Sequence, residues 1–186
     1  MRAEAPQAVH ELETGLPILE NFIVTPFPFD FVRIWYGFVI GNSGGGGTLY
    51  MEDRGMYTSR WRPGLLLYDA ILVHEMSHSY IGHEGLTQFL ELFIYNMART
   101  NSPNVQSWTF VRDYVPWHTS NVGVHALLDV YQLIGRDAMS NAYKAVYRLN
   151  PPYGQLLSSE SRQVFVNEAP AAVKAQVVDK MAKVGY

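Results

Sequence analysis

Two histidines separated by three residues are the part of this sequence best suited to chemistry. The segment His74-Glu75-Met76-Ser77-His78 has the pattern HExxH. In an α-helix, residues i and i+4 lie on one face, about 6 Å apart along the axis. Two imidazoles at that spacing can hold one Zn²⁺, with the intervening glutamate beside them to activate a water molecule. A histidine on an apolar helix face can also be an ordinary core residue, so a third ligand decides between these interpretations.

The residues around this motif predict two consecutive helices. The first covers about 64–82, because a stripe of residues recurs at helical spacing and Gly82 is a plausible stop. The members of the stripe are Leu67, Ile71, His74, His78 and Ile81. The second helix covers about 84–100 and begins near Glu84. A carboxylate at the start of a helix packed beside the first is well placed to complete a His₂Glu site.

The sequence HEMSH followed by EGLTQFLE resembles the gluzincin metallopeptidases, in particular the zinc aminopeptidase family that includes aminopeptidase N and leukotriene A4 hydrolase. In that family the helix after HExxH opens with Glu-Gly, and this glutamate is the third zinc ligand. The resemblance implies one Zn²⁺ bound by His74, His78 and Glu84, with Glu75 as the general base. Only five residues separate His78 from Glu84, whereas the family has a longer loop there, so His83 stays an alternative third ligand.

A second resemblance lies at Met51-Glu52-Asp53-Arg54-Gly55, which is similar to the Met-Glu-Asn-x-Gly segment of the same family. There, the glutamate binds the free α-amino group of the substrate, so the resemblance implies this substrate-binding role for Glu52. A carboxylate is a suitable partner for a buried ammonium group. The alternative is an exposed glutamate on an edge strand.

The family also has a tyrosine, just before the helix that corresponds to 121–135, that stabilises the tetrahedral oxyanion. The matching position in this chain is Ser120, and Tyr114 and His118 lie nearby in the sequence. A hydroxyl group at a helix start is often only an N-cap, so the oxyanion-stabilising residue stays open among these three, or is none of them.

The remaining elements are predicted from local composition. Residues 1–17 indicate an irregular lead-in, and three runs rich in β-branched and aromatic residues indicate strands at 18–25, 30–40 and 48–59. The glycine-rich run 42–47 indicates a turn or a backbone-lined cleft wall. Further helices are expected from about 119 to Gly135, from Asp137 to Pro151, and at 159–168 and 171–183.

These elements predict an α+β fold in a single domain spanning 1–186. Its parts are a β-rich lobe at about 18–60, the zinc-site helices at 64–100 and a helical part at 119–186. The family resemblance implies a thermolysin-like catalytic domain, in which a small N-terminal mixed β-sheet packs on the zinc-site helices and an all-α part follows.

Composition narrows the class of protein. Of the 186 residues, 48% are hydrophobic and 17% charged, and the net charge of −3 with a pI of about 6.0 offers no support for nucleic-acid binding. The absence of cysteine excludes disulfides and a thiolate zinc site. No apolar run reaches transmembrane length, and the N-terminal residues lack the apolar core of a signal peptide. The compartment, cytoplasmic or exported with a signal removed, and the oligomeric state stay open.

The expected function is therefore zinc-dependent peptide-bond hydrolysis on a peptide or protein substrate, with aminopeptidase-like specificity. Two alternatives stay open. One is a zinc endopeptidase, because the chain has no room for the additional N-terminal β-domain that helps to close the family's cleft. The other is a catalytically degenerate module that binds peptides or a partner.

Overall fold

The computed structural model describes most of the chain in six segments. These are residues 5–37, 43–45, 47–52, 71–100, 122–149 and 158–182. The predicted oxyanion candidates Tyr114, His118 and Ser120 lie outside the described residues, as do residues 53–70, which include part of a predicted strand and the start of a predicted helix.

The chain begins with a long helix, α1 (Ala5–Ile23), where an irregular lead-in and a strand were predicted. That prediction was wrong because the apolar residues repeat at helical spacing across both segments. Leu12, Leu19 and Ile23 all point into the core, and this burial outweighs the local β-propensity of 18–25. Pro17 lies inside α1 on its exposed face, away from the packed surface.

A small three-stranded sheet follows, formed by β1 (Arg33–Gly37), β2 (Ser43–Gly45) and β3 (Thr48–Glu52). The strand order is β1-β3-β2, with β1 parallel and β2 antiparallel to β3. Strands β1 and β3 fall within the predicted runs 30–40 and 48–59. The glycine-rich run was predicted as a turn or loop, but part of it is β2, because pairing with β3 satisfies its backbone groups. Among the described residues of the run, Gly47 lies in a turn and has a φ of 71°.

Helices form the rest of the described structure. Helix α4 spans Glu84–Thr100, as predicted, whereas α3 spans Ile71–Ser77 and ends before the predicted stop at Gly82. Helix α6 runs through Val122–Leu149 but changes direction at Gly135, whose φ of 80° confirms the break predicted there. Helix α7 (Ser158–Glu168), the 3₁₀ helix η3 (Ala171–Val173) and α8 (Lys174–Ala182) complete the chain, close to the two short helices predicted.

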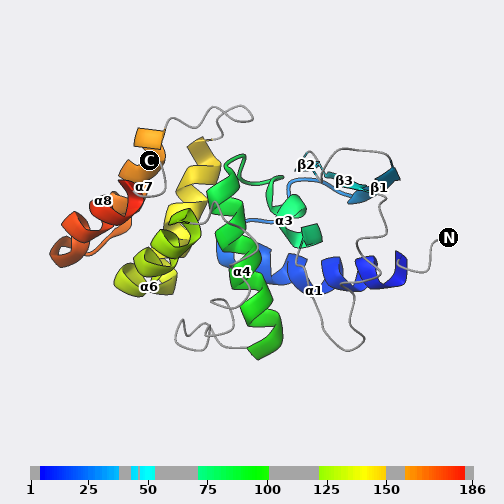
Figure 1. The fold of residues 1–186 in the computed structure, drawn as a ribbon, viewed down its shortest axis with the longest axis horizontal. Helices are drawn as coiled ribbons and strands as arrows, with labels where there is room; N and C mark the ends of the chain where they lie inside the picture. Colours follow the sequence, from blue (N-terminus) through cyan, green and yellow to red (C-terminus); the bar gives the residue numbers. More distant parts are fainter. Residues whose placement is uncertain are drawn as a thin grey trace.

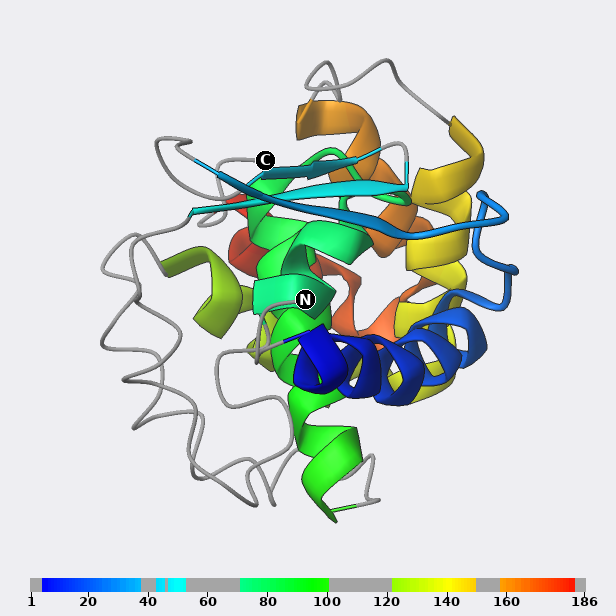
Figure 2. The same cartoon turned by 90° about the vertical axis from the view of Figure 1, so that its right-hand side faces the viewer.

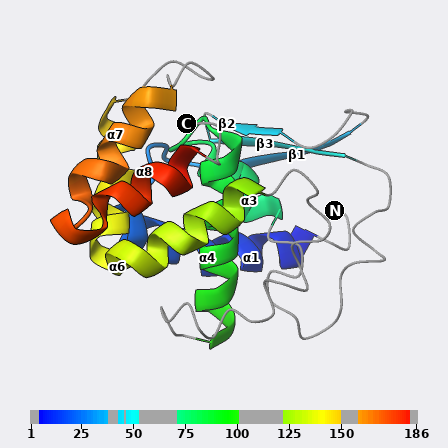
Figure 3. The same cartoon turned by 60° about the vertical axis from the view of Figure 1, so that its left-hand side comes forward.

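Helix α4 is the centre of the molecule (Figure 1). It packs against α1 and α3 on one side and against α6 on the other. Helix α3 lies between the sheet and α1 (Figure 2), and α6, α7 and α8 gather on the side of α4 away from the sheet (Figure 3). The core at the α4 contacts is aromatic, with Phe22 4.3 Å from Phe93 and 5.5 Å from Tyr143 between ring centroids.

The predicted α+β, thermolysin-like fold is wrong. The described part of the chain is mostly helical, and its strands have only five, three and five residues. The prediction overestimated the β-rich lobe because α1 occupies the residues assigned to its first strand, so the first described strand begins at Arg33. Among the described helices, none is long and apolar enough to span a membrane.

Candidate metal centre

Helix α3 carries the first predicted ligand, His74, and the second, His78, directly follows its C-terminal end. Leu72, Val73 and Met76 are fully buried and hold the helix against the core, and His74 is 5% exposed. The helix ends at Ser77 rather than at the predicted Gly82. It ends early because the chain forms a tighter turn, in which the Ser79 N–H donates to the carbonyl of Met76, three residues earlier, at 2.9 Å. His78 is the first residue beyond the helix, yet its ring remains beside that of His74, with centroids 5.0 Å apart.

Helix α4 begins at the third predicted ligand. The N–H groups of Leu86 and Thr87 donate to the His83 carbonyl, each at 3.1 Å, and form its first turn. The Thr87 hydroxyl donates to the Glu84 carbonyl at 2.8 Å. These bonds fix the backbone of Glu84, so its side chain leaves the helix start in a defined direction, toward α3.

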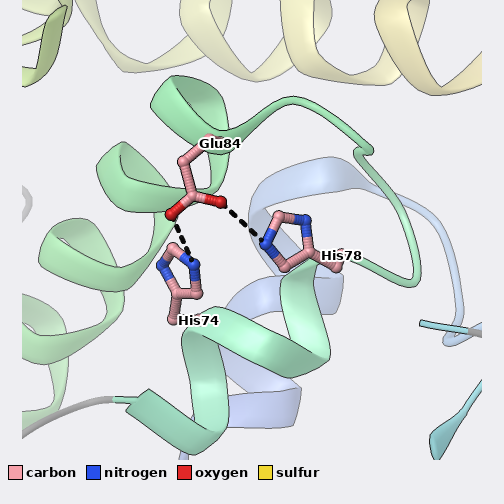
Figure 4. A group of neighbouring side chains, drawn as sticks. All are labelled: His74, His78 and Glu84. Atoms are coloured by element: carbon pink, nitrogen blue, oxygen red, sulfur yellow. Dashed lines mark ion pairs between the residues drawn. The ribbon is translucent and has the colours of Figure 1, made fainter. Parts of the chain in front are cut away.

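The three side chains converge between the two helices, as Figure 4 shows. Glu84 Oε1 lies 3.2 Å from His74 Nε2, and Glu84 Oε2 lies 3.3 Å from His78 Nε2. One ligand atom from each residue can be chosen such that all three lie within 4.8 Å of one another. The Glu84 side chain is 64% exposed whereas those of the histidines are largely buried, so the group is accessible from the carboxylate side.

The other ring nitrogen of each histidine faces an acceptor. His74 Nδ1 donates to Glu91 Oε2 at 3.0 Å, and His78 Nδ1 donates to the Ile81 carbonyl at 3.2 Å. A proton on Nδ1 leaves the Nε2 lone pair for a metal, and such acceptors orient the ligand rings in metal sites. Glu91 was not among the site residues predicted from the sequence. Its position seven residues after Glu84, on the same face of α4, could have indicated it.

His83, the alternative third ligand, does not join this group. Its Nδ1 accepts a hydrogen bond from the Gly85 N–H at 3.2 Å, so this ring nitrogen is engaged with the backbone at the start of α4. Burial is the main cause that lowers the pKa of His83. Among the described residues, the only group of three or more His, Cys, Asp or Glu side chains placed to hold a metal ion is His74, His78 and Glu84.

Within the group, the histidines and the glutamates strongly shift one another's pKa values. Burial lowers the pKa of His74, but hydrogen bonds and charges from Glu84 and Glu91 outweigh this and raise the pKa to about 10. Hydrogen bonds to His74 and His78 hold the pKa of Glu84 well below its usual range. Gln88 also donates to Glu84 Oε1, at 3.3 Å. Glu84 is therefore held ionised between two imidazoles, and a carboxylate must be ionised to bind a metal cation.

Glu75, the predicted general base, is 4% exposed. Burial raises the pKa of Glu75, and the charges of His74 and His78 oppose this rise. Glu75 is not a member of the ligand group. It is thus a buried carboxyl group next to His74 in the chain that is not itself one of the candidate ligands.

The donor set of the group is suited to zinc, and its ligand atoms are close enough to reach one ion. One ligand atom from each residue lies within 4.8 Å of the other two. The shorter distances, 3.2 Å from His74 Nε2 and 3.3 Å from His78 Nε2, involve the two different oxygens of Glu84. Two imidazoles and a carboxylate are also a ligand set that zinc favours, and three protein ligands leave a fourth position open.

Glu52, the predicted substrate-binding residue, is the last residue of β3. Strand β3 and its neighbour β2 both pack beside α3. The strand that carries Glu52 therefore adjoins the helix that carries His74 and Glu75, and the direction of the Glu52 side chain lies outside what the structure describes.

Comparison of the chain with protein-family models, with curated proteins and with solved structures found no match.

Proposed function

We propose that this chain is a zinc-dependent peptidase with His74, His78 and Glu84 as metal ligands and Glu75 as general base. The observation that carries the proposal is the convergence of both Nε2 atoms on one carboxylate, at 3.2 and 3.3 Å, while both Nδ1 atoms donate to other acceptors. This arrangement prepares three lone pairs for one cation. The resemblance of HEMSH and EGLTQFLE to the gluzincin peptidases supports the choice of reaction.

In this mechanism the ligands hold the ion, and Glu75 moves a proton. A bound zinc ion supplies Lewis-acid activation of water and of the scissile carbonyl. Glu75 accepts the proton of the attacking water and delivers it to the leaving amine as the C–N bond breaks. The burial of Glu75 favours this role, because a largely desolvated carboxylate does not exchange its proton freely with bulk water.

The more specific proposal is removal of N-terminal residues. It rests on the resemblance at Met51–Gly55 and on the packing of β3 beside α3. In this proposal the Glu52 carboxylate pairs with the free α-ammonium group of the substrate. Peptides with a free N-terminus should then be cleaved far faster than their N-acetylated forms.

The first experiment measures bound metal. Wild-type protein purified without chelators and dialysed against zinc should hold one zinc ion per chain. His74→Ala and Glu84→Gln should lose stoichiometric zinc, because an amide oxygen is a poor zinc ligand. His83→Ala should keep it, since His83 lies outside the group. Full zinc in His74→Ala, or a greater loss in His83→Ala than in Glu84→Gln, would contradict the assignment.

The second experiment measures turnover of the zinc-loaded protein. Glu75→Gln should keep its zinc and lose peptidase activity by about 10²-fold or more. Glu13→Gln, an exposed change of the same type on α1, serves as control and should leave activity unchanged. Glu52→Gln should impair hydrolysis of free N-termini much more than of acetylated ones. Equal effects on both would favour an endopeptidase, and no turnover of any peptide by zinc-loaded wild type would favour a peptide-binding module.

A further inference from the structure

The short turn at 78–83 joins the two helices that carry the candidate ligands. It contains His78 itself and also the acceptor for its ring, because His78 Nδ1 donates to the Ile81 carbonyl at 3.2 Å. Ile81 is 1% exposed, so its side chain anchors that carbonyl in the core. The direction of His78 Nε2 therefore depends on the conformation of this turn, rather than on α3, which ends at Ser77.

Tyr80 ties the turn to the segment between α1 and β1. Its hydroxyl donates to the Thr25 carbonyl at 3.1 Å, and the residue is 6% exposed. Two other aromatic rings pack against the Tyr80 ring, with centroids 5.8 Å away for Phe27 and 5.4 Å away for Tyr147. These contacts and the burial of the residue leave the Tyr80 ring little freedom, so its hydroxyl is directed at one acceptor.

The acceptor on Thr25 is itself held in place. Val24, just before it, has a φ of 54°, a left-handed conformation that β-branched residues rarely adopt. The Thr25 N–H donates to the Glu20 carbonyl at 3.3 Å, and the Phe27 N–H donates to Glu20 Oε1 at 2.7 Å. These bonds hold the chain at the end of α1 in a conformation that presents the Thr25 carbonyl to Tyr80.

Ser79 ties the same turn to the sheet. The Gly47 N–H donates to Ser79 Oγ at 3.4 Å, and the Gly47 carbonyl accepts from the Arg33 N–H at 2.8 Å. Gly47 has a φ of 71°, and a Cβ added there would lie 2.9 Å from the Phe31 carbonyl oxygen. Only glycine fits this position, so the contact with Ser79 comes from a well-determined corner of the sheet.

We propose that Tyr80 and Ser79 are positioning residues that hold the 78–83 turn in the metal-binding conformation before the metal arrives. The inference rests on the proposed metal centre, and it names the two contacts that would keep the turn of that centre rigid. Without these two contacts the turn samples more conformations in the metal-free protein, so binding must order it and the affinity falls. Tyr80 would influence the affinity of the centre although it is not one of the three candidate ligands.

The test compares Tyr80→Phe with Ser140→Ala. Each removes a hydroxyl group that donates to a backbone carbonyl near the end of α1, since Ser140 Oγ bonds to the Phe22 carbonyl, but only Tyr80 belongs to the turn. Zinc dissociation constants are measured by chelator competition, well below the unfolding temperature of either metal-free variant. Tyr80→Phe should raise the dissociation constant by about 3- to 10-fold and Ser79→Ala by about 2- to 3-fold. Ser140→Ala should leave it unchanged.

A spectroscopic measurement separates positioning from general destabilisation. The visible spectrum of the Co²⁺-substituted protein reports ligand geometry, and it should change in Tyr80→Phe but not in Ser140→Ala. Equal zinc affinities in wild type and Tyr80→Phe, or equal losses in Tyr80→Phe and Ser140→Ala, would overturn the inference and leave the metal centre standing. If Tyr80→Phe does not fold, Ser79→Ala decides, and unchanged affinity there overturns the inference. Failure of wild type to bind zinc would instead overturn the proposed function.

Discussion

Glu91 is the residue outside the candidate ligand set that bears most directly on the candidate metal centre. It is 1% exposed and its Oε2 accepts from His74 Nδ1 at 3.0 Å. A buried carboxylate in this position would hold the Nδ1 proton when a metal displaces the proton of Nε2, and it would increase the basicity of Nε2. The two histidines therefore differ in their hydrogen-bond acceptors. His74 Nδ1 donates to a carboxylate, whereas His78 Nδ1 donates to a neutral backbone carbonyl.

At this scale we predict that Glu91→Gln weakens zinc binding by about 10- to 100-fold, the range typical for loss of such a partner. The amide keeps the size of the side chain but removes its charge, so the fold should persist. Zinc affinity is measured by chelator competition, with Glu13→Gln, exposed on α1, as the matched control. A wild-type affinity in Glu91→Gln would show that the contact with His74 does not tune the ligand.

Among the elements, the contact between α1 and α3 determines where the HExxH helix sits. Gly15 of α1 faces Val73 of α3, and a Cβ added at Gly15 would lie 2.6 Å from Val73 Cγ2. Val73 is fully buried and immediately precedes His74. Glycine at this position allows α1 to approach α3 closely, and so helps to hold the backbone that carries the first ligand.

We therefore predict that Gly15→Ala destabilises the protein, although alanine favours a helix over glycine by about 1 kcal/mol. Overpacking against a stiff β-branched side chain costs about 1–3 kcal/mol and should exceed that gain. Urea denaturation of the metal-free protein measures the change. In a Val73→Ala background the space opens, and Gly15→Ala should then be neutral or stabilising. A stabilised single variant in the wild-type background would contradict the close packing.

Considered over the whole molecule, the proposed metal centre would join elements that are otherwise linked by packing and by a few side-chain hydrogen bonds, such as that of His74 with Glu91 and that of Tyr143 with the Leu86 carbonyl. Its ligands come from α3, from the turn after it and from the start of α4, and α4 contacts α1, α3 and α6. Burial of Leu86, Phe89 and Phe93 orders α4 independently of any metal. The folded state is thus expected to exist without zinc and to be stabilised further by it.

The corresponding prediction is that zinc raises the unfolding temperature of the wild-type protein. A ligand at one hundred times its dissociation constant that binds only the folded state adds about 2.7 kcal/mol of stability. Thermal unfolding followed by circular dichroism, with zinc and with a chelator, measures the shift. His74→Ala should unfold at the same temperature in both conditions. A zinc-dependent shift of equal size in that variant would place the stabilising ion elsewhere.

Features that depend on local spacing could be predicted from the sequence alone. His74 and His78 lie close together because only three residues separate them, although the turn after α3 directs the ring of His78, and the bounds of α4 follow from its apolar pattern. The break at Gly135 likewise follows from one residue that tolerates a positive φ. In each case the interactions that determine the structure join residues a few positions apart, so these features can be predicted from the sequence.

Features that depend on how distant segments pack could not be predicted from the sequence and became known from the folded structure. Residues 18–23 became helical because α1 buries them against α3 and α4, and Ser43–Gly45 became a strand because β3 supplies its partners. The choice of Glu84 over its neighbour His83 was decided in the same way. Adjacent residues at a helix start point in different directions, and the angle at which α4 meets α3 brings only one of them to both histidines.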